Sequence, residues 1–286
     1  MEFEREIHAR YQQAYAQGLK SLDEKKQHRL PACPAALDTL LDEKMVSCRM
    51  EIGRMEIPTD LIVGVSRDTE ETKLFTKEFL PISAPNTAYA DSWRMLNKQY
   101  SMRRSFDDAI SCFEYLGKFY VDDGLKRVSV AKFAGTKNIA ADVVRVLPMR
   151  TGSREVDLYF DFLSIYRRTK LYQLQFTQYG FFERLQAALG RKTGYYWTDT
   201  DRHAFLAHWG RIEDAFYKSY QDSLRITAAD ALVVLLDRYS FDQIIAMDPW
   251  VLARIFQAFW KELYALSFPE ENRFEEIQTS GILQTA

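Results

Sequence analysis

The stretch YVDDGLKRVSVAKFAG, residues 120–135, decides how the first half of the chain folds. It starts as an apolar β-like run, turns at two aspartates and a glycine, passes two cations and then follows a helical pattern that ends at Gly135. A strand that runs through glycine into a helix brings free backbone N–H groups and the positive end of the helix dipole to one point. The stretch therefore predicts either a phosphate-binding turn or an ordinary connection between a strand and a helix.

The side chains of the turn suit an anion. Gly124 allows a close backbone approach that a side chain would block. Lys126 and Arg127 add two positive charges beside the amides, and an arginine can grip two phosphate oxygens at once. Asp122 and Asp123 can hold a divalent metal or accept a proton from a hydroxyl. If the stretch is only a connection, the same aspartates and glycine serve as turn and cap.

Around this stretch the pattern alternates between strands and helices. Residues 1–29 predict a helix with an apolar stripe of Ile7, Tyr11, Tyr15 and Leu19, and a short second helix starts near Pro34. Strands are expected over 45–67, in two short runs before Gly124, and over 139–148; helices are expected over 68–80, with Asp68 as its cap, and over 89–101. This alternation predicts an α+β module over residues 45–150, preceded by a helical extension over 1–44.

The character of the chain changes after residue 151. Five stretches with helical periodicity follow, and Gly180, Gly194, Thr227 and the pair Asp248-Pro249 mark their boundaries. We therefore expect an all-α domain of about five helices over residues 151–268 and a flexible polar tail over 269–286. The aromatic runs, with Trp197, Trp209, Trp250 and Trp260, are expected in its core, and an interface is the alternative.

Four elements in order resemble the ParB/sulfiredoxin-like superfamily. FYVDDGLKRVSVAKFAG is similar to its signature of strand, glycine, one residue, a basic pair and an alanine-rich helix. EIPTDLIVGVSR resembles its opening strand, which ends in an arginine, here Arg67. AISCFEYLGKFYVDDG and IAADVVRVLP resemble the hairpin before the signature and the strand after it. The resemblance covers about residues 50–148.

The resemblance implies a nucleotide or nucleic-acid phosphate site formed by Gly124, Lys126, Arg127 and Arg67. Nuclease and serine-kinase relatives place an aspartate before the glycine, so Asp123 is the implied catalytic residue, and a nucleotide with magnesium is the implied cofactor. Leu125 stands where sulfiredoxins carry cysteine and chromosome-partitioning ParB proteins carry glutamate. The resemblance therefore does not extend to cysteine-sulfinic acid reduction or to a CTP switch.

Three functions stay open from the sequence. The first is a regulatory or DNA-associated protein that binds a nucleotide or nucleic-acid phosphate; the second is a phosphotransferase or nuclease that uses Asp123. The third is a non-catalytic scaffold on a degenerate ParB-like fold, whose aromatic helical half contacts a protein partner or a second copy. Whether the chain is an enzyme is left open.

Composition sets the limits on these functions. The chain has 286 residues, 47% hydrophobic, and a net charge of −2, which excludes a general polyanion binder. Residues 94–150 nevertheless carry 11 Lys and Arg against 6 Asp and Glu, a mild basic bias around the motif. Three widely spaced cysteines, no metal-ligand pattern and no secretory signal favour a cytoplasmic protein with reduced thiols. No apolar run approaches the roughly 18–20 residues of a membrane helix.

Two weaker patterns lie in the second half. Residues 176–194 invite comparison with a helix-turn-helix, but their spacing is poor, and a packed helix with Arg184, Arg191 and Lys192 in solvent is the favoured interpretation. His203 and His208 lie five residues apart, a spacing that does not bring two imidazoles onto one helix face. We therefore expect no metal site.

Overall fold

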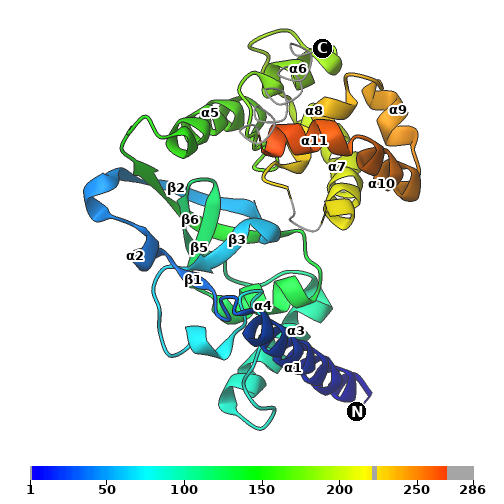
Figure 1. Cartoon of the computed structure of the whole chain (residues 1–286). Helices are drawn as coiled ribbons and strands as arrows, with labels where there is room; N and C mark the ends of the chain where they lie inside the picture. The colour runs from blue at the N-terminus through cyan, green and yellow to red at the C-terminus, as the bar shows by residue number, and fades with distance from the viewer. Residues whose placement is uncertain (1, 221–223, 269–286) are drawn as a thin grey trace, which may run out of the picture. The chain divides into compact units, whose positions relative to one another are not determined.

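The computed structural model describes residues 2–220 and 224–268 (Figure 1). The chain divides into two compact units, Met1–Val156 and Asp157–Ala286. The first unit is a mixed α/β structure built on one sheet, and the described part of the second is helical. The predicted tail over 269–286 lies outside the described residues.

Six strands form the sheet of the first unit. They are β1 (Ala35–Ala36), β2 (Val46–Pro58), β3 (Ile62–Val65), β4 (Ile110–Tyr115), β5 (Lys118–Asp123) and β6 (Asn138–Pro148). Their order across the sheet is β1-β3-β5-β4-β6-β2. Strand β3 runs parallel to β1 and β5, β4 runs parallel to β6, and the β4–β5 and β2–β6 pairs are antiparallel. The strands expected over 45–67, before Gly124 and over 139–148 are confirmed.

Two glycines shape this sheet. The β4–β5 hairpin turns through Leu116 and Gly117, which have φ values of 50° and 76°, the left-handed pair that suits a tight hairpin. Gly53 lies inside β2, with φ of 83° at a shift of register against β6. Cross-strand neighbours Glu114 and Arg145 form an ion pair, and the Glu114 side chain is fully buried.

Three long helices pack against one another in the first unit (Figure 1). They are α1 (Glu2–His28), α3 (Ala88–Arg103) and α4 (Leu125–Phe133), and a short helix, α2 (Leu37–Leu40), follows β1. Helix α4 contacts β4, α3 packs on α4, and α1 packs on α3. The fully buried Trp93 of α3 donates its indole N–H to Ser129 of α4 at 2.9 Å. The helices expected over 1–29 and 89–101 are confirmed, as is the helix that follows Gly124.

The helix expected over residues 68–80 is wrong. Only a 3-10 turn forms there, η3 (Thr72–Leu74), like the other short turns η1 (Glu43–Met45) and η2 (Thr59–Leu61). Threonine hydroxyls bond nearby backbone groups in place of a helical ladder: the Thr76 hydroxyl accepts from the Leu80 amide at 3.2 Å. Phe79 takes a left-handed φ of 64°, which ends any helical continuation.

The buried stripe of α1 also differs from the expected one. Ile7 and Tyr11 are buried, but Leu19 is exposed and Gly18 lies on the buried face. A β-carbon on Gly18 would lie 2.3 Å from the backbone oxygen of Pro81. The helix therefore buries glycine because the loop backbone approaches too closely for a side chain.

The described part of the second unit holds seven helices, not about five. They are α5 (Arg154–Thr169), α6 (Phe181–Ala188), α7 (Asp199–Tyr220), α8 (Ala228–Leu235), α9 (Phe241–Ala246), α10 (Pro249–Ala258) and α11 (Trp260–Ser267). The last expected helix breaks at Phe259 into α10 and α11. Helix α9 was missed, although Ser240 and Gln243 form a capping box at its start.

The core of the helical unit is aromatic and aliphatic, as expected, and Trp197 and Trp209 lie in it. Trp250 and Trp260 do not: their exposed fractions are 62% and 42%, so their expected place in the core is wrong. Asp230 is a fully buried acid of this unit, and it caps α8 together with Thr227.

Within residues 2–220 and 224–268, every helix is too short or too polar to cross a lipid bilayer.

Candidate functional site

The predicted turn forms between β5 and α4. Gly124 is the N-cap residue of α4, with φ of 103° and ψ of 24°, and it has no side chain to accept from the first-turn amides. A β-carbon at this position would lie 2.7 Å from Cγ2 of Ile110 and 3.0 Å from Nε of Arg127. Glycine is therefore required here by both the backbone angle and the space. The first-turn N–H groups lack an intrahelical acceptor, as at every helix start.

Arg127 is directed to its own chain. One terminal nitrogen, Nη1, donates to the backbone oxygens of Asp108 at 3.0 Å and Ala109 at 2.7 Å, just before β4 begins. The other, Nη2, bonds a carboxylate oxygen of Asp123 at 2.6 Å. The Arg127 side chain is only 15% exposed. Arg127 therefore ties the start of β4 to the end of β5, and Asp123 is its ion-pair partner.

Lys126 is engaged by the loop that follows β3. Its Nζ lies 2.6 Å from a carboxylate oxygen of Glu71, and 5.3 Å from the centre of the Tyr89 ring. The hydroxyl of Tyr89 is buried and has no hydrogen-bond partner among the described residues. Burial raises the pKa of Tyr89, and the nearby charges of Tyr11 and Glu71 raise it further. The ammonium of Lys126 thus lies between a carboxylate and an aromatic face.

The remaining predicted residue, Arg67, follows directly after β3. Since Val65 and Val121 are neighbours in the parallel β3–β5 pair, the segment after β3 begins beside the end of β5. The Ser66 hydroxyl bonds the Asp122 carboxylate at 2.6 Å. Arg67 is exposed, and its guanidinium has no partner among the described residues. It lines a cavity of about 210 Å³ together with Asp38, Glu43, Arg49 and others.

The five predicted residues therefore lie near the carboxyl ends of the neighbouring strands β3 and β5, but their surroundings differ. Gly124, Lys126, Arg127 and Asp123 belong to the turn itself, whereas Arg67 borders a cavity whose lining includes none of those four.

The basic bias around the turn is largely neutralised within the fold. At least six of the eleven cations in residues 94–150 form ion pairs with carboxylates, namely Arg94, Lys98, Arg103, Lys126, Arg127 and Arg145. A seventh, Lys132, donates to the backbone oxygen of Ile62, and burial lowers its pKa. The sequence bias thus overstates the charge that this segment offers to an external anion.

No group of three or more His, Cys, Asp or Glu side chains among the described residues is arranged to hold a metal ion. His203 is exposed and its ring bonds the backbone oxygen of Asp199, whereas His208 is half-buried at another cavity.

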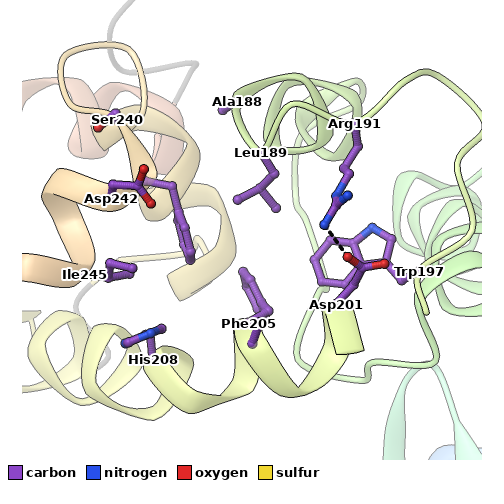
Figure 2. A pocket seen from close by; sticks show the side chains of 12 residues that line it. Ala188, Leu189, Arg191, Trp197, Asp201, Phe205, His208, Ser240, Asp242 and Ile245 are labelled. Carbon is purple, nitrogen blue, oxygen red and sulfur yellow. Dashed lines mark hydrogen bonds and ion pairs between the residues drawn. The ribbon is translucent and has the colours of Figure 1, made fainter. Parts of the chain in front are cut away.

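That other cavity lies in the helical unit and measures about 350 Å³ (Figure 2). It is bounded by the end of α6, the first half of α7 and helix α9. Its lining comprises Ala188, Leu189, Arg191, Trp197, Asp201, Ala204, Phe205, His208, Ser240, Phe241, Asp242 and Ile245. No motif in the sequence indicates this cavity.

Several residues of the turn and of the helical cavity belong to no motif that could be recognised in the sequence. Glu71 lies far from Lys126 along the chain. Because a helix was expected over 68–80, the loop that brings Glu71 to Lys126 was not predicted. Tyr89 was placed on a helix, but nothing in its spacing indicates that it faces Lys126. For the helical cavity, the Ser240–Gln243 capping box is the one usable signal, because it would have placed α9.

Comparison of this chain with protein-family models, with curated proteins and with solved structures finds no match in any of the three.

Proposed function

We propose that the first unit binds a phosphate-bearing ligand, a nucleotide or a nucleic-acid phosphate, at the turn between β5 and α4, on a ParB/sulfiredoxin-like fold. The observation that carries the proposal is the turn itself. A strand enters Gly124 at a φ that only glycine adopts freely, and α4 begins with no side-chain cap. Amides in that arrangement, at the positive end of a helix, favour an anion.

In this proposal Lys126 binds the phosphate and Arg127 positions the turn. Arg127 uses its donors on Asp108, Ala109 and Asp123, so its contribution is to hold β4, β5 and the turn in one geometry. Lys126 is 29% exposed, and one ammonium can exchange its partner without disturbing the backbone.

Glu71 then competes with the ligand for Lys126. Its carboxylate lies at hydrogen-bond distance from the ammonium, and its side chain is 44% exposed. A phosphate that reaches the turn must therefore displace it. The net gain in affinity is reduced by whatever the Lys126–Glu71 pair contributes, which for a partly exposed pair is up to about 1 kcal/mol.

The test is calorimetric titration of the full chain with pyrophosphate, with ATP in the presence and absence of magnesium, and with a short duplex DNA. We expect binding by at least one of these probes that weakens between about 50 and 200 mM salt. Lys126→Ala should weaken it about tenfold, the effect of losing a charge-assisted hydrogen bond. Glu71→Gln should strengthen it by up to about fivefold.

A matched control exists on the same loop. Glu70 is 90% exposed and pairs with Lys73 at 2.6 Å, away from Lys126, so Glu70→Gln should leave the affinity unchanged. Binding that survives Lys126→Ala, or the absence of salt-sensitive binding by every probe, would overturn the proposal. Asp123→Asn in an assay of magnesium-dependent turnover separates a phosphotransferase or nuclease from a binding protein.

A scaffold is the second candidate, and the exposed aromatic side chains of the helical unit favour it. Tyr217, Trp250 and Trp260 are each at least 42% exposed, and aromatic residues are enriched in protein contact surfaces. Light scattering after size-exclusion chromatography tests this candidate. A monomer at all accessible concentrations, together with phosphate binding as above, would reject self-assembly in favour of the first function.

A further inference from the structure

The cavity of the helical unit has the size and lining of a small-molecule site. Its volume, about 350 Å³, falls within the roughly 300–1,000 Å³ of ligand pockets in proteins. Figure 2 shows the side chains of Leu189, Phe205 and Ile245 between helices that come from three separate parts of the sequence. Such a cavity belongs to one unit and does not depend on the phosphate-binding turn.

One side of the cavity offers a flat apolar surface. The rings of Phe205 and Phe241 are parallel to within 10°, with their centres 5.9 Å apart. Phe205 is buried in the core, and Phe241 is half-buried at the cavity. Phe205 also stacks with Trp209, with ring centres 5.4 Å apart, so the aromatic surface left for a planar ligand is that of the half-buried Phe241.

A second side is polar but already satisfied. Arg191 and Asp201 form an ion pair, and Asp201 also accepts from the Tyr195 hydroxyl and the Thr198 amide, both at 2.8 Å. Burial alone would raise the pKa of Asp201, but the bonds from Thr198, Tyr195 and Arg191 together lower it to about 2. The pair therefore stays ionised, contributes no net charge, and forms a fixed wall.

Three polar side chains of the lining make no hydrogen bond or ion pair in the described parts of the chain: His208, Asp242 and the buried indole N–H of Trp197. His208 is half-buried on α7, and Asp242 is exposed on α9. Arg191 and Asp201 cancel one another, so the carboxylate of Asp242 is the acidic group of the lining that has no paired cation among the described residues. A positively charged group on a ligand could pair with the Asp242 carboxylate.

From this combination we propose that the cavity binds a planar aromatic molecule carrying one cationic amine. The ring system packs against Phe241 and Leu189, and the amine pairs with Asp242. The imidazole of His208 forms a hydrogen bond with the ligand.

The test uses two probes with the same ring and opposite charge, tryptamine and indole-3-acetate, titrated into the full chain by saturation-transfer NMR and calorimetry. We expect tryptamine to bind about fivefold or more tightly than indole-3-acetate, because one charge pairs with Asp242 and the other is repelled by it. Asp242→Asn should remove that preference. Asp248→Asn is the matched control, since Asp248 is exposed in the same unit, makes no side-chain cap and does not line the cavity.

Ala204→Trp tests the place of binding. Ala204 is exposed on α7 and lines the cavity, so a large side chain fills the space without entering the core. Its fold is checked by circular dichroism, and Ile245→Trp provides a second cavity-filling variant from α9. Loss of tryptamine binding in a folded variant supports the site. No binding of tryptamine by the wild type, equal binding of both probes, or binding that both folded variants retain would overturn the proposal.

Discussion

Replacing Asp230 by alanine should destabilise the helical unit by about 3–4 kcal/mol. The Asp230 carboxylate is fully buried and accepts from the Thr177 amide at 3.0 Å, the Thr177 hydroxyl at 3.0 Å and the Thr227 amide at 2.9 Å. Removing it takes this acceptor away from two backbone donors, the amides of Thr177 and Thr227, at about 1–3 kcal/mol each; the Thr227 bond is also the part of the α8 capping box that Asp230 supplies. Partial exposure of the two threonines keeps the expected sum in the lower half of the resulting range of about 2–6 kcal/mol.

The assay is urea unfolding followed by tryptophan fluorescence. Four of the five tryptophans lie in the helical unit, and Trp197 and Trp209 are buried there, so the signal reports mainly on this unit. With a slope of about 1–1.5 kcal/mol per molar urea for a unit of this size, the midpoint should fall by about 2–4 M.

The control is Asp237→Ala, which removes an acid that is 54% exposed and pairs with Arg184. It should cost less than about 1 kcal/mol. If Asp230→Ala costs no more than this control, water satisfies the threonine donors and the argument from buried hydrogen bonds is wrong.

The same residue gives a pH dependence of opposite sign to ordinary acid unfolding. Burial raises the pKa of Asp230 above 3.8, despite the hydrogen bonds from Thr227 and Thr177 that lower it. The folded state therefore binds this proton more tightly than the unfolded state, and its contribution to the free energy of unfolding falls as pH rises from about 4 through the folded pKa. Urea midpoints of Asp230→Asn, measured over this window, should lack that fall; a parallel course of variant and wild type would contradict it.

Three further outcomes are expected. Gly124→Ala should destabilise the first unit by about 2 kcal/mol in urea unfolding monitored by circular dichroism, because alanine is strained at φ of 103°, and an unchanged midpoint would show that the turn relaxes. Glu114→Gln should cost about 3 kcal/mol, more than the double change Glu114→Leu with Arg145→Met, since the single change removes the carboxylate charge from a largely buried guanidinium. Burial raises the pKa of Cys112 to about 12, so its thiol should react with a disulfide reagent far more slowly than the exposed Cys48; equal rates would count against the packing of β4.

The sequence predicted local structure best where backbone chemistry is decisive. Gly124 and Gly135 bracket α4 with left-handed angles, and Gly117 closes the β4–β5 hairpin, so these boundaries could be placed from the residues alone. The helix expected over 68–80 failed because threonine side chains and a left-handed Phe79 outweighed its helical periodicity. Tertiary contacts decide such segments, and periodicity does not report them.

In the candidate site, too, the backbone conformation could be predicted but the tertiary contacts could not. Its backbone could be predicted, but the partners of its cations could not: Glu71 reaches Lys126 from a distant loop, and Arg127 bonds backbone oxygens that carry no sequence signal. The cavity of the helical unit was beyond prediction, because it arises where three helices leave a gap between their side chains. Counting charges likewise could not reveal that most cations near the turn are paired within the fold.

The pairing of β2 with β6 has a consequence for how the first unit is made. Val46 pairs with Pro148, and β6 is the sole neighbour of β2 in the sheet. During synthesis β2 therefore leaves the ribosome early and stays unpaired until β6, the last strand of the sheet, has been translated. Non-local pairing of this kind slows folding, and a fragment that stops before Asn138 exposes open strand edges that invite aggregation. Any gene fragment meant to yield this unit alone should extend past Pro148.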